Sequence, residues 1–487
     1  GNCLYFDFQL CALWGRTTYY RKLPMRKPFL CADGGSKNVY KRSSVYIFLS
    51  LILLLNGRVP QYGELKLPPR HIIIKYCWET FELGLKDKND FVKTSTLTTL
   101  GRIGSASAAE TIASADLGVK PQVTRTAVAT LAQMHDSAAF QALLRFRGHS
   151  DFFVRENVAM GMVRMRDLYG DTLVARVLKR MYLYVDSIES DTMFYEKSEI
   201  QQERREIKTK LAIAISSVDP RFPDPQIALA YRNAPLAARV TLVNFIGAVK
   251  PPNALTWLSP FMIDSSTYVR SKTAEALGKI ASPQAYDMLR GMLRTQRREE
   301  VIVNAAIALM PADEARAVEV LIQAMDTYDE DTQSNILLAL GEAKLPESRA
   351  KILPLVKSAV TGKGDWVRIG AIGALGLIKD TTTLPLIEAA LEDPVDEVRE
   401  IAVGVLAQMK GETMVDRLKA WAKDDQYSMR SVALAGLGSL RDPVIVEKTV
   451  YPVLYNTMKF DPEMMVRVRA AFTLLNIIND RKYTKGI

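Results

Sequence analysis

Two stretches of the sequence carry the same pattern of residues. The first is Tyr268-Val269-Arg270-Ser271-Lys272-Thr273-Ala274-Glu275-Ala276-Leu277-Gly278, and the second is Trp366-Val367-Arg368-Ile369-Gly370-Ala371-Ile372-Gly373-Ala374-Leu375-Gly376. In both, a basic residue is followed by small or apolar residues three and seven positions later, and by glycine at position eight. Offsets of three and seven fall on one face of an α-helix, so each copy predicts a helix with an apolar face.

The pattern recurs twelve times between residue 87 and residue 487, and seven of the eleven spacings between successive copies equal 31 residues. The residue seven positions after the anchor is apolar in every copy. At position eight, nine of the twelve copies have Gly, Ala or Ser, which lets a neighbouring helix approach closely. A fixed period of this length is the signature of a repeat architecture. The anchors are Lys93, Thr124, Arg155, Lys208, Arg239, Arg270, Ile302, Gln333, Arg368, Arg399, Arg430 and Arg467.

Second amphipathic segments, such as residues 283–293 and 383–391, lie between the copies. Each repeat is therefore predicted to be a pair of helices, and its apolar faces are covered only when neighbouring pairs stack. The sequence has no sustained alternation of apolar and polar residues, so no strand is expected. The predicted fold is all-α: an α-solenoid of about 12 helix pairs over residues 87–487, preceded by an irregular N-terminal leader.

The pattern Asp-x-x-Val-Arg-x-x-Ala-x-x-Ala-Leu-Gly resembles HEAT repeats, and it is most similar to the short bacterial variety also found in phycobilin lyases. Asp365-Trp366-Val367-Arg368-Ile369-Gly370-Ala371 and Asp396-Glu397-Val398-Arg399-Glu400-Ile401-Ala402 are close matches. The resemblance covers roughly residues 87–480 and implies a bacterial superhelix of stacked helix pairs. It leaves the function open, because this scaffold serves many roles.

We interpret the anchor arginines as structural residues that pair with aspartates about three positions earlier and fix the turn between helices. The alternative is that they bind an acidic partner. The copies at Thr124, Ile302 and Gln333 have no basic anchor, so a ladder of Asp/Arg pairs is expected to be interrupted there. The arginine anchors are Arg155, Arg239, Arg270, Arg368, Arg399, Arg430 and Arg467.

The basic character of the chain lies near its N-terminus. Residues 1–86 contain 13 Lys/Arg and 5 Asp/Glu, whereas the remaining residues contain 51 and 49, so the body gives little support for phosphate binding. All four cysteines also precede residue 87, and none shows the C-x-x-C spacing of a zinc or redox site.

The apolar run Val45–Leu55 follows Lys41-Arg42, which is the composition of a signal-peptide core. If it is a signal, the protein is expected in the cell envelope or periplasm, and otherwise in the cytoplasm. The alternatives are a buried helix or strand that caps the first repeat, or a gene model extended beyond a true start at Met25 or later. We assign residues 1–60 to the leader and 61–86 to a linker or N-terminal cap.

The regular period is broken once by a long insertion. Arg155 and Lys208 are 53 residues apart, which is 22 more than the repeat length, and the extra residues fall around 180–205. One interpretation is a binding loop that presents Phe194 and Tyr195, because insertions in repeat proteins are often binding elements. The other is a longer helix pair, with residues 200–210 continuing as a charged helix.

Catalytic signatures are scarce. None of the three histidines is followed by Glu, so the His-Glu pairs of the di-iron hydroxylases within the HEAT-like enzymes are missing. Ser150-Asp151 is expected to cap the helix that carries Arg155. We therefore expect no catalytic residue, no cofactor and no metal site.

The leading hypothesis is a non-catalytic scaffold or adaptor that binds a protein partner on the concave surface of the solenoid. Candidate contacts are Phe194, Tyr195, Lys272, Lys279 and Arg294. Two alternatives remain: a chaperone-like lyase for a tetrapyrrole, and a nucleic-acid-binding HEAT protein, which requires a continuous basic stripe and is the less expected of the two. Membrane contact is expected only through the N-terminal segment.

Overall fold

The computed structural model describes residues 67–479, apart from 119, 192–197, 220, 223–230, 232–233, 297–298 and 326–327. The chain divides into two units, Gly1–Pro69 and Arg70–Ile487. The run Val45–Leu55 lies outside the described residues. Every regular element in the described ranges is a helix, so this part of the chain is all-α. None of the helices described is both long and apolar enough to span a bilayer.

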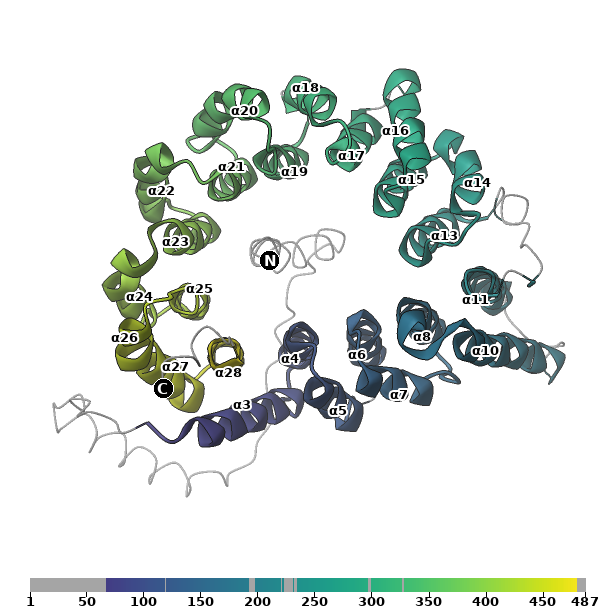
Figure 1. Ribbon diagram of the computed structural model, residues 1–487, viewed down its shortest axis with the longest axis horizontal. Helices are drawn as coiled ribbons and strands as arrows, with labels where there is room; N and C mark the ends of the chain where they lie inside the picture. The colour runs from purple at the N-terminus through teal and green to yellow at the C-terminus, as the bar shows by residue number, and fades with distance from the viewer. Residues whose placement is uncertain are drawn as a thin grey trace, which may run out of the picture. The chain divides into compact units, whose positions relative to one another are not determined.

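Twelve of these helices form an inner layer in which each packs against the next (Figure 1). Each contains one of the twelve anchors, so the sequence period and the helix order agree and the predicted α-solenoid is confirmed. The inner helices are α4 (Asp90–Ile103), α6 (Pro121–Gln133), α8 (Phe152–Arg164), α11 (Ser198–Ser216), α13 (Leu236–Val249), α15 (Thr267–Ile280), α17 (Glu299–Leu309), α19 (Glu330–Gly341), α21 (Asp365–Ile378), α23 (Asp396–Lys410), α25 (Tyr427–Leu437) and α28 (Met464–Asn479).

The helices between them form the outer layer (Figure 1). Several are short or are interrupted by 3₁₀ turns. They are α3 (Arg70–Leu85), α5 (Ala106–Ser114), α7 (Ser137–Arg145), α9 (Arg166–Tyr169), α10 (Asp171–Asp191), α14 (Ala254–Leu258), η2 (Ser259–Ile263), α16 (Pro283–Thr295), α18 (Glu314–Ala324), α20 (Pro346–Ala359), η4 (Thr381–Thr383), α22 (Leu384–Ala389), η5 (Ala390–Glu392), η6 (Gly411–Met414), α24 (Val415–Trp421), α26 (Pro443–Ile445), η7 (Val446–Val450) and α27 (Tyr451–Phe460).

The core lies between the two layers and follows the repeat register. The apolar residue seven positions after each anchor is completely buried in all twelve repeats. Burial of side chains of this size is the main favourable contribution to folding. These residues are Leu100, Leu131, Met162, Ile215, Ile246, Leu277, Leu309, Leu340, Leu375, Leu406, Leu437 and Leu474.

The small residues at position eight set the distance between inner helices. A Cβ on Gly247 of α13 would lie 2.8 Å from Cβ of Ala276 on α15, and one on Gly341 of α19 would lie 2.7 Å from Cα of Ala374 on α21. Real Cβ atoms do not approach other atoms so closely, so glycine is required for this spacing. The predicted close approach is confirmed at these two interfaces.

The last inner helix returns to the beginning of the described unit. Helix α28 packs against both α3 and α4, so the helical array closes on itself (Figure 1). At this seam, Sγ of Cys77 on α3 lies 3.6 Å from Sδ of Met458 on α27. Residues 61–86 were expected to form a linker or cap, and the structure places the 16-residue helix α3 within this range.

We expect the closed seam to make the thiol of Cys77 react slowly. Its side chain is fully buried, and burial raises the pKa of the thiol to about 12. In a variant with Cys3, Cys11 and Cys31 replaced by Ser, we expect Cys77 to react with Ellman's reagent roughly a thousandfold more slowly in the native state than in denaturant, because thiolate is the reacting species.

The substitution Val468→Asp places a charge in the seam, because Val468 is buried on α28 and lies beside Gly84 of α3. It should restore fast labelling of Cys77 without denaturant. Equal labelling rates for the native and denatured forms of the parent protein would contradict a closed seam.

The insertion lengthens a helix pair. Helix α10 has 21 residues and α11 has 19, whereas the neighbouring outer helix α7 has 9 and the inner helix α13 has 14. Residues 200–210 lie within α11, as the helical interpretation predicted. Phe194 and Tyr195, the residues of the binding-loop interpretation, lie outside the described residues.

Candidate functional site

Three anchor arginines join successive repeats through an aspartate of the following repeat. These pairs lie at the N-terminal ends of the inner helices and are largely buried, so removing one partner of a pair is expected to cost more stability than breaking an exposed pair. They are Arg239 Nη1 to Asp264 at 2.9 Å, Arg368 to Asp393 at 2.8 and 3.0 Å, and Arg430 to Asp461 at 2.8 and 2.9 Å.

The pairing expected with an aspartate three residues earlier occurs at two anchors. Arg368 contacts Asp365 at 3.0 Å, and Arg399 contacts Asp396. Two other anchors use neutral acceptors. Arg270 Nε donates to Oε1 of Gln296 at 3.0 Å, and Arg467 Nε donates to the Met458 carbonyl at 2.9 Å.

The ladder continues at two positions where interruptions were expected. Next to Thr124, Nε of Arg125 donates to Oδ2 of Asp151 in the following repeat at 2.8 Å. The side-chain amide of Gln333 donates to the carbonyls of Met325 and Tyr328 at 2.9 and 3.0 Å. These neutral hydrogen bonds connect the inner helix to the preceding loop where other anchors use an arginine. The expectation of an interruption at Thr124 was wrong, because the arginine stands one position further along the helix.

Asp151 has two roles at this point. Its Oδ1 accepts hydrogen bonds from the backbone N–H groups of Phe153 and Val154 at 2.8 and 3.2 Å, and its Oδ2 accepts from Arg125. The prediction that Ser150-Asp151 caps this helix is confirmed for Asp151, the N-cap residue of α8. The carboxylate of Asp151 is therefore already neutralised and hydrogen-bonded.

Arg155 departs from the other arginine anchors. Only 2% of the residue is exposed, yet in the described part of the chain its side chain has no hydrogen-bond acceptor, and Nε is buried without a partner. The ring of Phe152 covers one face of the guanidinium at 4.6 Å. Burial lowers the pKa of Arg155, with Tyr184 opposing this effect and Arg204 adding to it. Burying a charged side chain without a hydrogen-bond acceptor costs folding free energy, so the environment of Arg155 is energetically unfavourable in this state.

The insertion accounts for the missing acceptor. Arg239 and Arg368 each bind an aspartate 25 residues later, in the loop before the next inner helix. Twenty-five residues after Arg155 the chain has Arg180, which lies inside the long helix α10. The lengthened helix therefore replaces the loop that would have supplied an aspartate.

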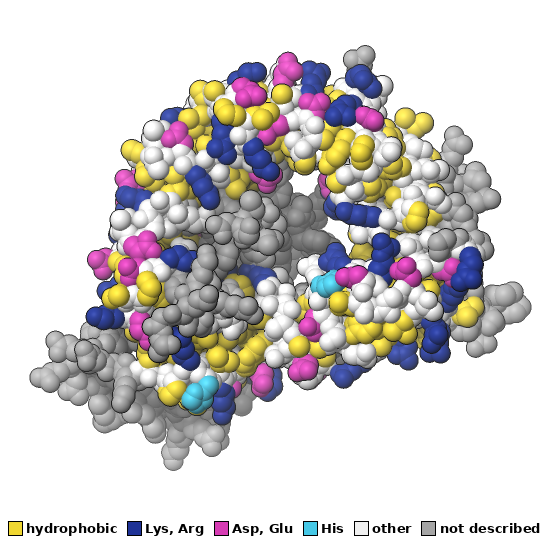
Figure 2. Space-filling model, in the orientation of Figure 1, with side chains coloured by type: hydrophobic (Ala, Val, Ile, Leu, Met, Phe, Trp, Pro, Cys, Tyr) yellow, Lys and Arg dark blue, Asp and Glu magenta, His cyan; other side chains and the backbone are white. Residues whose placement is uncertain are grey.

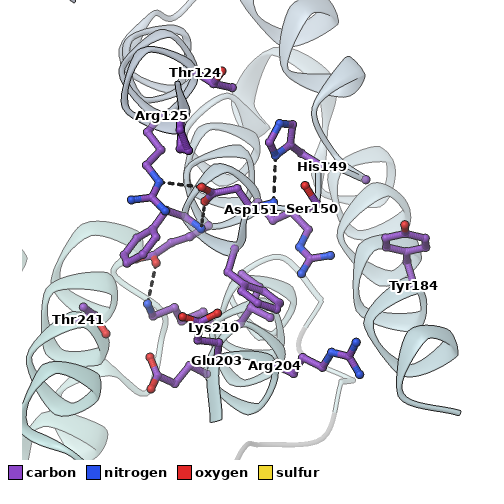
Figure 3. A pocket seen from close by; sticks show the side chains of 18 of the residues that line it. Thr124, Arg125, His149, Ser150, Asp151, Tyr184, Glu203, Arg204, Lys210 and Thr241 are labelled. Atoms are coloured by element: carbon purple, nitrogen blue, oxygen red, sulfur yellow. Dashed lines mark hydrogen bonds and ion pairs between the residues drawn. The ribbon is translucent and has the colours of Figure 1, made fainter. Parts of the chain in front are cut away.

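Arg155 lines a pocket of about 960 Å³ between the N-terminal regions of α6, α8 and α13 and the middle of α11. Figure 3 shows Tyr184 on α10 and Arg204 on α11, the two long helices of the insertion, at the same pocket. The charged groups lining it are Arg125, Arg155, Arg204 and Lys210, together with Asp151, Glu156, Glu203 and Glu206.

Two of the basic groups in this pocket are compensated. Arg125 is paired with Asp151, and Nζ of Lys210 lies 2.6 Å from Oε2 of Glu156 (Figure 3). Burial raises the pKa of Glu156, although the adjacent ammonium of Lys210 lowers it in part. The nearly buried Lys210–Glu156 pair lines the pocket, and its two charges compensate each other.

A second pocket, of about 480 Å³, adjoins the first through His149 and Tyr184. Among the described residues, its charged lining consists of Arg145, Arg147 and Arg180, and none of those residues that line it is acidic. The two pockets together therefore carry more basic than acidic groups, although the body of the chain is nearly neutral.

Of the sequence-predicted contacts, Lys272, Lys279 and Arg294 do not line these pockets, and Phe194 and Tyr195 lie outside the described residues. Lys272 on α15 pairs with Glu275 at 2.6 Å and lies over the ring of Tyr268 at 5.5 Å. Lys279 is exposed in the last turn of α15, whereas Arg294 is exposed on α16, which belongs to the outer layer instead of the inner layer.

Sequence reasoning missed Tyr184 and Arg204, although the broken period pointed to their region. Within the described residues, no group of three or more His, Cys, Asp or Glu is placed to hold a metal ion.

Comparison with known proteins identifies the repeats. The family model described as HEAT repeats matches residues 225–310 and 352–438. No curated protein matches the chain. Similar solved structures include the complex of CpcE and CpcF of phycocyanin lyase from Nostoc sp. PCC7120, with 15% identity, 62% of this chain and 99% of that chain covered and a TM-score of 0.31.

Two others are Kap121p, with 12% identity, 98% and 52% covered and a TM-score of 0.35, and human deoxyhypusine hydroxylase in complex with glycerol, with 18% identity, 59% and 98% covered and a TM-score of 0.23. This chain thus spans about half the length of Kap121p. The family match thus places HEAT repeats in these two regions, and the twelve inner helices with their anchors extend the same repeat pattern over the described part of the chain.

Proposed function

We propose that the protein is a scaffold that binds a protein partner along the first turns of its inner helices, an edge that we name the rim. The observation that carries this proposal is the exposure of large apolar side chains at the rim. Phe153, Leu236 and Tyr268 are each 46% exposed, and they lie in the first turns of α8, α13 and α15. Phe91 of α4 and Tyr427 of α25 occupy equivalent positions.

The repeat architecture brings these side chains to one edge. Each outer helix returns the chain, so successive inner helices run in the same direction and their first turns are adjacent. Helix α13 packs against both α8 and α15, which makes Phe153, Leu236 and Tyr268 neighbours along the rim. Exposed aromatic side chains are enriched in protein interfaces and supply much of the binding energy there.

The charge distribution favours a protein over a nucleic acid as the partner. Basic and acidic side chains are intermixed over the visible face (Figure 2). The larger pocket, which opens beside Phe153, is lined by four acidic and four basic residues, so it is not part of the continuous basic stripe that a nucleic-acid backbone requires. A protein surface offers both apolar and charged groups and matches this mixture better.

The test compares two double variants of the full chain. Phe153→Ser/Tyr268→Ser removes aromatic groups from the rim, whereas Ile263→Ser/Phe460→Ser removes two side chains from the outer layer that are 81% and 76% exposed. Partners cross-linked to the wild-type protein are identified and purified, and their affinities for all three proteins are measured. We expect the rim variant to bind about tenfold more weakly and the control to bind normally.

Equal binding by both variants would contradict the proposal. Uptake of a bilin by the purified protein, with no protein partner retained, would favour the lyase alternative instead.

A further inference from the structure

We propose that the pocket at Arg155 receives a carboxylate group from an acidic segment of a protein partner. This inference rests on the proposed scaffold function and specifies the chemistry of the partner. Its basis is the combination of a nearly buried arginine that has no hydrogen-bond acceptor among the described residues, the pocket that this arginine lines, and the adjoining basic pocket.

The equivalent arginines indicate which group fits. Arg155 occupies the position on α8 that Arg239 occupies on α13 and Arg368 on α21, and both of those bind a carboxylate from the following repeat. The guanidinium fork matches a carboxylate geometrically and can donate two parallel hydrogen bonds. A carboxylate from a partner would therefore take the place of the aspartate that the insertion has removed.

The charges around the pocket select a singly charged group. Arg125 and Lys210 already have carboxylate partners, so they contribute little net attraction. Glu203 and Glu206 also line the pocket and oppose a second negative charge on the same ligand group. A carboxylate carries one charge, whereas a phosphate monoester carries nearly two at neutral pH.

The adjoining pocket extends the site beyond one group. Arg145, Arg147 and Arg180 are exposed and line it, and no acidic side chain joins them in the part of the chain that the structure describes. A peptide with several acidic residues can place one carboxylate at Arg155 and others at these three arginines. This arrangement favours an acidic segment of a protein over an isolated small carboxylate.

The experiment measures the binding of a labelled, acetylated tetra-aspartate peptide amide to the full chain by fluorescence anisotropy at fixed ionic strength. The tetra-asparagine peptide tests the need for charge, and sodium acetate as a competitor tests whether a free carboxylate suffices. Arg155→Met removes the proposed receptor. Arg294→Met removes the same charge from an exposed position on the outer helix α16 and is the matched control.

We expect the tetra-aspartate peptide to bind the wild type and Arg294→Met equally, and Arg155→Met about tenfold more weakly. The tetra-asparagine peptide should not bind. Equal weakening by both substitutions would show non-specific attraction and overturn the inference. Displacement of the peptide by acetate at the same ionic strength would show that a free carboxylate is sufficient to occupy the site, and this result would also overturn the inference.

A stability measurement separates ligand binding from a structural role. Without ligand, Arg155→Met should unfold at the same or a higher denaturant concentration than the wild type, because it removes a buried charge that has no acceptor. A clear decrease would assign Arg155 a structural role and overturn the inference.

The inference and the proposed function can fail separately. If the peptide does not bind but the rim variant still loses its partner, only the carboxylate site is wrong. If the peptide binds as expected but partner binding is unchanged in the rim variant, only the proposed rim interface is wrong.

Discussion

Replacing Gly370 with alanine is expected to lower the free energy of unfolding by about 3 kcal/mol, an unusually large effect for the addition of one methyl group. A Cβ at this position on α21 would lie 2.6 Å from Oγ of Ser334 on α19, 2.7 Å from its Cα and 2.8 Å from its carbonyl oxygen. Two of these atoms belong to the backbone, so the clash is relieved only if the two helices move apart. The buried contacts between α19 and α21 would be loosened along the whole interface.

The matched control is Gly291→Ala in the outer helix α16. No atom lies within 4 Å of a Cβ built at Gly291, so the substitution should stabilise the protein by about 0.5–1 kcal/mol through the higher helix propensity of alanine. Urea unfolding followed by circular dichroism measures both variants, and hydrogen exchange locates the change. If Gly370→Ala and Gly291→Ala changed the free energy of unfolding by the same amount and in the same direction, the close approach of α19 and α21 would be contradicted.

The second large effect is expected for Arg368→Met. Arg368 binds Asp393 through two hydrogen bonds and also contacts Asp365 and the carbonyls of Gly362 and Lys363. The side chains of Arg368 and Asp393 are 11% and 12% exposed, so removal of the guanidinium leaves Asp393 largely buried without its partner. We expect a loss of about 3 kcal/mol at pH 7, measured by denaturant unfolding.

This loss should depend on pH. Burial alone would raise the pKa of Asp393. The hydrogen bonds from Arg368 and from the backbone N–H of Val395 lower the pKa by more than burial raises it, so the pKa in the folded state is below its ordinary value. A carboxyl group of this kind stabilises the fold above its unfolded pKa, near 4, and loses that contribution as the pH falls through the folded pKa. The stability difference between wild type and Arg368→Met should therefore shrink below about pH 4.

The control for this prediction is Arg316→Met. Arg316 and Glu319 form an ion pair of 2.8 Å on α18, but their side chains are 54% and 52% exposed. Exposed pairs contribute at most about 1 kcal/mol, so this variant should remain close to wild type at every pH. A loss as large as that of Arg368→Met would show that burial does not determine the strength of the ladder.

Much of the fold followed from local sequence spacing. Leu277 and Met162 were placed in the core because they stand seven positions after an anchor, and both are fully buried. Such predictions succeed because residues at this spacing lie on the same helix face, whatever the rest of the chain does. The anchors Arg368 and Arg399 were likewise paired correctly with aspartates on their own helices.

Predictions about contacts between repeats were less successful. The continuation of the ladder through Arg125 was missed, because its aspartate lies 26 residues away and the register between repeats is set by packing. Arg294 was a candidate contact on the concave surface, whereas the structure places it on an outer helix. The insertion was located from the broken period, but its pocket-lining residues Tyr184 and Arg204 were not identified.

The sequence by itself determined the helix pairs, the register of their apolar faces and the position of the insertion, because each of these depends on residues close together along the chain. Only the tertiary structure decided that α28 closes against α3 and α4 and that Arg155 is buried with no acceptor from the described residues. Closure depends on the sum of small rotations between successive repeats, and no single repeat encodes that sum. The isolation of Arg155 likewise depends on where the long helix α10 ends relative to α8.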